Sequence, residues 1–220
     1  LMRTMAMGSK KSTYVPDPDP AREREYAEKL STMVQCETVS VRDVSEPEKF
    51  RQFHKVLEQL YPTVFANCEK IELEGNLLMR WKGKSSDNPI MLMSHMDVVA
   101  AGPGWSHDPY GGEISDGKIW GRGTGDTKCS IMAFYQAAEE MLKEGYVPPV
   151  DVYLCSSCTE EVGGDGAPRI VNWLKANGVK LAMLSDEGGG IISEPIGGVP
   201  GGGMRFGGTL NAHAYVDESY

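Results

Sequence analysis

The sequence predicts an α/β domain in which a β-sheet is layered with helices. Short apolar segments with strand character alternate along the chain with longer segments whose apolar residues recur at helical spacing. Such alternation is typical of α/β proteins, in which helices connect the strands of one sheet. Acidic residues and a histidine follow several of these strands, which is where α/β sheets bind ligands. The length of 220 residues is sufficient for one such domain.

The first part of the chain is predicted to be an extended lead-in followed by two helices and two strands. Prolines within residues 14–20 fix their own φ and restrict the residues before them, so this stretch is extended. Apolar residues at helical spacing predict a helix over 21–34 and a second over 47–60, which begins at residue 46 or 47. Alternation predicts a strand over 73–81, and a short apolar run predicts a buried strand over 89–94.

The second part of the chain continues the alternation after a long loop. Residues 102–125 contain eight glycines and two prolines, which predicts a loop with a hairpin around Ser115-Asp-Gly117. The pattern over 126–144 predicts an amphipathic helix that ends before Gly145, a typical C-terminal cap. The elements expected next are a strand over 150–155, a helix over 167–176 and a strand over 179–184. The chain is glycine-rich from about residue 194, where no element is predicted.

Composition and charge exclude several classes of function. Lys and Arg number 22 and Asp and Glu number 31, so the net charge of −9 argues against binding to nucleic acids or anionic membranes. No apolar stretch approaches the roughly 20 residues that span a bilayer, and residues 1–12 lack the features of a secretory signal. The five cysteines are scattered and odd in number, as expected in a reducing compartment. We therefore expect a cytoplasmic protein with no nucleic-acid or membrane partner, and a disordered or expression-derived tail over residues 1–16.

Potential metal ligands and bases follow three of the predicted strands and open the long helix: His95, Asp97, Asp126, Glu160, Glu161, Asp186 and Glu187. Because the carboxyl ends of parallel strands meet at one edge of a sheet, these side chains are expected to converge on one crevice. Carboxylates packed so closely repel one another unless a cation neutralises them. A set of imidazole and carboxylate ligands without a thiolate suits zinc, with cobalt or manganese as alternatives.

Each of these positions, taken singly, also has a purely structural interpretation. An aspartate that opens a helix, such as Asp126, is usually a cap. The pair Glu160-Glu161 is compatible with a solvated turn before Gly163-Gly164, and a single histidine at a strand end is usually a hydrogen-bonded structural residue. These interpretations weaken when the positions are considered together, because all of them are expected at the same edge of the sheet.

Four segments of the chain resemble, in order, the motifs of the zinc-dependent aminoacylase/carboxypeptidase family of metallopeptidases. This family includes aminoacylase, carnosinase, glutamate carboxypeptidase and succinyl-diaminopimelate desuccinylase. The segments are Ser94–Val99, Trp105–Lys128, Thr159–Gly164 and Ser185–Gly189. The sequence Asp-Glu-Gly-Gly in the last of them is similar to the branch of Gly-Xaa carboxypeptidases and N-acyl-amino-acid hydrolases. The resemblance implies a three-layer α/β/α catalytic domain over residues 17–220, with a mostly parallel mixed sheet.

The resemblance also implies which residues bind metal. His95 would bind one ion, Asp126 would bridge two ions, and Glu161 would bind the second. Asp186 would complete the first site, with Glu187 as the alternative because members of the family differ at this position. The implied cofactor is two zinc ions per site, with Co²⁺ or Mn²⁺ as alternatives.

Catalytic roles follow from the same resemblance. Glu160 would be the general base that takes a proton from a metal-bridging water, and Asp97 would hold the imidazole of His95 in its ligating tautomer. The bond between Asp126 and Thr127 is expected to be a non-proline cis peptide bond.

The function that the resemblance implies is the metal-dependent hydrolysis of amide or peptide bonds in dipeptides or N-acyl amino acids. Members of the family are about twice as long, carry a lid or dimerisation domain that makes a homodimer of the full-length form, and end the site with a further histidine. Neither the lid nor this histidine is recognisable here, and His213 matches the family pattern poorly. We therefore expect the chain to bind about one metal ion and to hydrolyse little. The alternative hypothesis is a non-catalytic metal-binding remnant, or a subunit that needs a lid from a partner.

Overall fold

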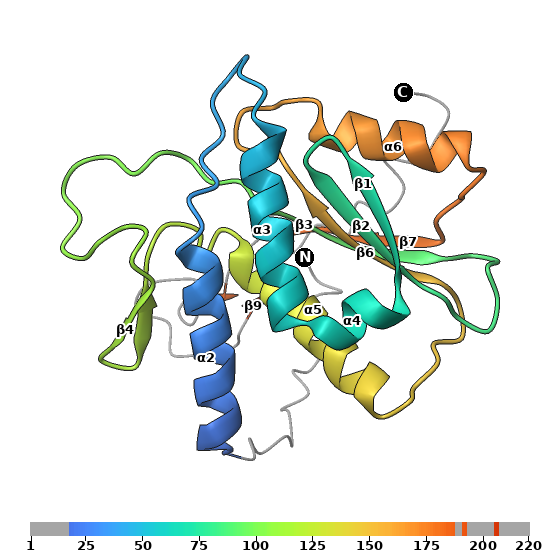
Figure 1. The fold of residues 1–220 in the computed structure, drawn as a ribbon, viewed down its shortest axis with the longest axis horizontal. Coiled ribbons are helices and arrows are strands. Elements are labelled where there is room, and N and C mark those ends of the chain that lie inside the picture. Colours follow the sequence, from blue (N-terminus) through green and yellow to red (C-terminus); the bar gives the residue numbers. More distant parts are fainter. Residues whose placement is uncertain (1–17, 188–190, 193–204, 207–220) are drawn as a thin grey trace, which may run out of the picture.

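In the computed structural model, which describes residues 18–187, 191–192 and 205–206, a five-stranded mixed sheet lies between two layers of helices (Figure 1). The strand order is β1-β2-β6-β3-β7. β3 pairs in parallel with β6 and β7, whereas β2 is antiparallel to both β1 and β6, so β2 alone runs against the other four strands. The strands are β1 (Glu69–Leu73), β2 (Asn76–Trp81), β3 (Ile90–His95), β6 (Val152–Ser157) and β7 (Met183–Ser185).

Helices pack on both faces of this sheet (Figure 1). They are α2 (Pro20–Val34), α3 (Pro47–Leu60), α4 (Pro62–Asn67) and α5 (Lys128–Lys143) on one face, and α6 (Gly166–Ala176) on the other. Successive residues of a strand point to opposite faces, and in β2 Leu77 packs with the first group of helices while Leu78 packs with Ile170 of α6. This confirms the three-layer α/β/α architecture. Among the described helices, none has the length and apolar character needed to cross a membrane.

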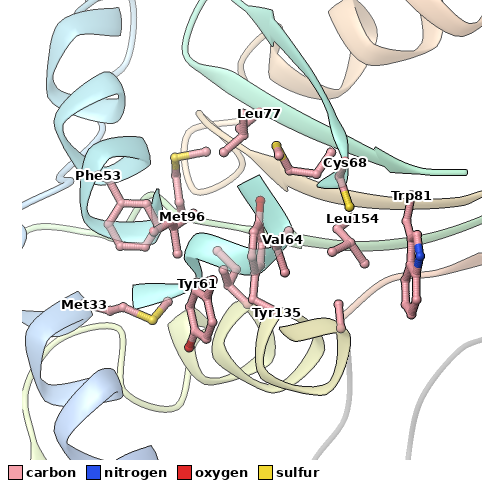
Figure 2. Close-up of a cluster of buried hydrophobic side chains, with 14 of the residues drawn as sticks. Met33, Phe53, Tyr61, Val64, Cys68, Leu77, Trp81, Met96, Tyr135 and Leu154 are labelled. Carbon is pink, nitrogen blue, oxygen red and sulfur yellow. The ribbon is translucent and has the colours of Figure 1, made fainter. Parts of the chain in front are cut away.

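The larger core cluster lies between the sheet and helices α2–α5 (Figure 2). Met33 of α2, Phe53 of α3 and Tyr135 of α5 are fully buried in it. The rings of Tyr61 and Tyr135 lie 5.4 Å apart between centroids. This packing fixes the position of α5 on the sheet, and therefore also the position of the loop that precedes α5.

The predicted elements are largely confirmed, with three differences, one of which is that the strand predicted over 179–184 is limited to β7 (Met183–Ser185). Residues 73–81, predicted as one strand, contain the end of β1, a turn and β2, because Glu74 and Gly75 adopt φ angles of 45° and 101° that reverse the chain. The short helix α4 was not predicted. The hairpin around Ser115-Asp-Gly117 is present as β4 (Glu113–Ser115) and β5 (Lys118–Trp120).

Residues 1–16, and most of the chain beyond residue 194, lie outside the described residues, so the predictions for them remain predictions. Two short strands, β8 (Ile191–Ile192) and β9 (Arg205–Phe206), pair with each other in an antiparallel manner.

The N-terminus of α4 is capped by a buried carboxylate from α5. Glu139 accepts hydrogen bonds from the backbone N–H groups of Thr63 (3.2 Å) and Val64 (2.9 Å), which have no partner within the helix. Burial raises the pKa of Glu139, but these hydrogen bonds outweigh burial and the pKa is lowered. The stability that this cap contributes is therefore present above the ordinary pKa of a glutamate and is lost as the pH falls through the lowered pKa.

We expect Glu139→Gln to lower the free energy of unfolding by about 2 kcal/mol, because one buried amide then faces an NH₂ group instead of an acceptor. Urea denaturation followed by circular dichroism measures this change. Glu144→Gln, at the exposed end of the same helix, is the matched control and should leave stability unchanged. Equal stability of the two variants would show that the cap contributes nothing.

The connections that follow β3 and β6 leave the sheet on opposite faces. α5 follows β3 on one face and α6 follows β6 on the other, while β3 and β6 are neighbours with His95 opposite Ser157 at their carboxyl ends. Where the connections of adjacent parallel strands diverge in this way, a crevice opens at the carboxyl edge of the sheet. The predicted ligands end β3, follow β6 and β7, or precede α5, and they are therefore expected to meet at this crevice.

Candidate metal centre

His95, the last residue of β3, lies at the carboxyl edge of the sheet, beside carboxylates from three other segments. Its side chain is only 1% exposed, and its Nδ1 lies 2.8 Å from the backbone carbonyl oxygen of Asp97, to which it donates. Its Nε2 faces carboxylates: Asp126 at 3.1 Å, Glu187 at 3.2 Å and Glu160 at 3.8 Å. Because Nδ1 is occupied as a donor, Nε2 of the neutral imidazole is the nitrogen that can bind a metal ion.

Two sets of side chains have the spacing of metal ligands. In each set, one ligand atom per residue lies within 4.8 Å of the others; the sets are His95, Asp126 and Glu161, and His95, Glu160 and Glu187. Both sets share His95, which has a single free nitrogen and can therefore serve one ion. Imidazole and carboxylate donors without a thiolate fit zinc and also manganese or cobalt.

The carboxylates of the crevice repel one another. Burial and the charge of Asp126 raise the pKa of Glu161. Burial also raises the pKa of Glu187, even though the charge of His95 acts in the opposite direction. For His95, burial lowers the pKa, but the hydrogen bond with Asp97 and the charge of Glu187 outweigh burial and raise the pKa to about 10. A divalent cation in the crevice would neutralise the same group of negative charges.

Asp97 connects the crevice to the loop that follows β6. The side chain is fully buried, and its Oδ1 and Oδ2 accept hydrogen bonds from the backbone N–H groups of Glu160 and Glu161, both at 3.1 Å. Oδ2 also accepts a hydrogen bond from the hydroxyl of Ser40, and Oδ1 lies 3.5 Å from Nδ1 of His95. Burial raises the pKa of Asp97, but the hydrogen bonds from His95 and Ser40 outweigh it and the pKa is lowered. Asp97 is therefore an ionised, buried group that joins three segments.

Asp126 stands on the turn that leads into α5, and its side chain is 72% exposed. The peptide bond between Asp126 and Thr127 is cis, as predicted. The next residue, Lys128, is fully buried, and its ammonium group donates to the carbonyl oxygens of Met33 (3.1 Å) and Cys36 (2.6 Å). These bonds tie the turn that presents Asp126 to the C-terminal end of α2.

The structure brings five of the predicted site residues together: His95, Asp97, Asp126, Glu160 and Glu161. After β7, Glu187 contacts His95, whereas Asp186 accepts the backbone N–H of Glu187 at 2.8 Å and belongs to neither ligand set. The metal-ligand role of either residue remains a prediction, and His213 lies outside the described residues. Ser40 and Lys128 were not predicted, since neither belongs to a periodic or motif-like pattern of ligands.

Comparison with known proteins gives three consistent matches. The model of peptidase family M20/M25/M40 matches residues 91–215. The N-fatty-acyl-amino acid synthase/hydrolase PM20D1.1 of Danio rerio is 33% identical over 205 residues, which cover 90% of this chain and 40% of that protein. The probable carboxypeptidase S-like 2 of Dictyostelium discoideum is 35% identical over 184 residues, covering 78% of this chain and 35% of that protein.

Among solved structures, human carnosine dipeptidase 1 shares the fold. The match has a TM-score of 0.60 and 22% sequence identity, and it covers 78% of this chain and 42% of the dipeptidase. The matches thus cover between 35% and 42% of the length of these three proteins.

Proposed function

Since the chain belongs to peptidase family M20/M25/M40, we propose that its crevice is the metal centre of an amide-bond hydrolase in which Glu160 is the general base. The observation that carries this proposal is that His95 belongs to two sets of candidate ligands, whose carboxylates come from three separate segments; within each set the ligand atoms lie within 4.8 Å of one another. Such a concentration of negative charge is costly without a cation. Bound zinc would supply a Lewis acid that lowers the pKa of a water molecule and polarises the scissile carbonyl.

The proposed ligands are His95, Asp126 and Glu161, together with one acidic residue after β7. Support for Glu187 at this last position comes from its 3.2 Å distance to Nε2 of His95, and support for Asp186 comes from the family resemblance alone. The exposed side chain of Asp126 leaves one side of the centre open to solvent and substrate. An open side is characteristic of catalytic metal sites, whereas structural sites are closed by protein ligands.

The role of Glu160 as the base is supported by its environment. Its side chain is 52% exposed, so water can approach it, and its Oε2 lies 3.8 Å from Nε2 of His95, beyond hydrogen-bonding distance. Its backbone is held by Asp97, so the carboxylate has a fixed point of attachment beside the ligands. Glu160 also belongs to the ligand set with His95 and Glu187, and we assign it as the base that accepts a proton from the attacking water, with the metal held by the other set.

The proposed substrates are N-acyl amino acids or dipeptides. The names of the Danio rerio and Dictyostelium discoideum relatives, an N-fatty-acyl-amino acid synthase/hydrolase and a probable carboxypeptidase S-like protein, support this class. Both classes of substrate present an amide bond next to a carboxylate.

Zinc titration combined with an activity assay tests the proposal. We expect the metal-free protein to bind about one zinc ion in isothermal titration calorimetry, and to hydrolyse N-acyl amino acids or dipeptides slowly, in a manner that a chelator stops and added zinc restores. Binding without turnover would favour the alternative, a metal-binding chain that is not catalytic or that needs a partner. Failure to bind zinc, cobalt or manganese would exclude both.

A further inference from the structure

We infer that Ser40 is a positioning residue of this centre: it fixes the carboxylate of Asp97, which in turn holds the backbone of Glu160 and Glu161. The inference rests on the proposed function, because these two glutamates are its base and one of its metal ligands. Ser40 is separated from the loop of Glu160 by 120 positions in the sequence and lies in the connection between α2 and α3.

The loop after β6 does not hold its conformation through local preferences alone. Thr159 has a φ of 65°, in the left-handed region that β-branched residues avoid at a cost of roughly 1–3 kcal/mol. Gly164 donates from its backbone to the carbonyl oxygen of Thr159 at 2.8 Å, and a Cβ at Gly164 would lie 2.5 Å from Oγ1 of Thr159. Such a turn persists only where surrounding contacts fix it, and the next two amides, those of Glu160 and Glu161, bind Asp97.

The carboxylate of Asp97 must keep one orientation to serve both amides. Oδ1 faces the N–H of Glu160 and Oδ2 faces the N–H of Glu161, so a rotation about the Cβ–Cγ bond would break both hydrogen bonds. The hydroxyl of Ser40 donates to Oδ2 and opposes this rotation. Because the carboxylate is fully buried, no solvent replaces this donor directly when the hydroxyl is removed.

The backbone of Ser40 is held in place independently of its hydroxyl. The N–H of Ser40 donates to the carbonyl oxygen of Val98 at 3.2 Å, and the N–H of Val98 donates to the carbonyl oxygen of Thr38 at 3.1 Å. The hydroxyl of Thr38 also donates to the carbonyl oxygen of Met96 at 2.6 Å. Removal of the Ser40 hydroxyl is therefore expected to release the carboxylate of Asp97 and to leave the segment docked.

This arrangement gives Ser40 a matched control within the same segment. Thr38 has a buried hydroxyl of the same kind, but that hydroxyl binds a backbone carbonyl and not Asp97. Thr38→Val should lower stability without changing zinc affinity.

Ser40→Ala should weaken zinc binding by about 10-fold, the lower end of the effect of losing a group that orients a metal ligand. It should also lower kcat more than it raises KM, because Glu160 acts on the water and not on substrate binding.

The experiment compares wild type, Ser40→Ala, Ser40→Thr and Thr38→Val by zinc competition with a chromophoric chelator, with urea denaturation to compare stability. Weaker zinc binding in Ser40→Ala, recovered in Ser40→Thr and absent from Thr38→Val, would support the inference. Wild-type affinity in Ser40→Ala, or an equal loss in Thr38→Val, would overturn it and leave the proposed function intact. A wild-type protein that binds no zinc would instead overturn the proposed function.

Discussion

Replacement of Glu160 by glutamine is expected to lower the rate of amide hydrolysis by about 10²–10⁴-fold while the zinc content stays close to that of the wild type. The amide of glutamine cannot accept the proton of the attacking water. The carboxylate of Glu160 is 52% exposed and lies 3.8 Å from His95, so its loss should leave the ligands of the ion in place. The measurements are kcat with an N-acyl amino acid and zinc content by elemental analysis.

Glu161→Gln is the matched control for this experiment. The two residues are adjacent, and both donate their backbone N–H groups to Asp97, so both variants preserve the loop. Glu161 belongs to the ligand set of His95 and Asp126, so its replacement should lower zinc occupancy first and activity as a consequence. If both variants lost zinc equally, the assignment of Glu160 as base and Glu161 as ligand would be wrong.

His95→Ala is expected to weaken zinc binding by more than about 100-fold, which exceeds the usual effect of losing a group that only orients a ligand. His95 belongs to both ligand sets, and its Nε2 is the neutral nitrogen donor of whichever set holds the ion. Without it, the crevice contains carboxylates alone, which bind zinc less tightly than a mixed set of nitrogen and oxygen ligands. Titration calorimetry with zinc measures the change.

His107→Ala provides the control for His95. His107 also pairs with a carboxylate, with its Nδ1 2.9 Å from Oε2 of Glu113, but it lies in the loop before β4 and stacks on Trp120. We expect this variant to bind zinc as the wild type does. Retention of zinc affinity in His95→Ala, or a comparable loss in His107→Ala, would show that the metal site lies elsewhere.

The elements predicted from sequence were those whose pattern is local. The apolar face of α5 recurs at helical spacing, and the turn in Ser115-Asp-Gly117 contains the residues that a tight hairpin requires. The helix α4 was not predicted because it has only six residues, too few to show a periodic pattern. The carboxylate that caps it comes from Glu139, 75 or more positions away in the sequence. The sequence signal for the turn after Glu74 was Gly75, which adopts a φ of 101°, but a single glycine within a predicted strand also fits a bulge and does not by itself indicate a hairpin.

The sequence by itself determined that His95 and acidic residues from several separate segments meet at the candidate centre. Parallel strands end at one edge of a sheet, so a histidine and acidic residues that follow separate strands converge there whatever the details of packing. The tertiary structure alone decided how they contact one another: Glu187 and not Asp186 faces His95, and Ser40 and Asp97 hold the loop of Glu160. These contacts depend on the register between β3 and β6, and on how the segment of Ser40 docks against Asp97, 57 positions further along the chain. The periodicity of apolar residues along a chain contains no information about either.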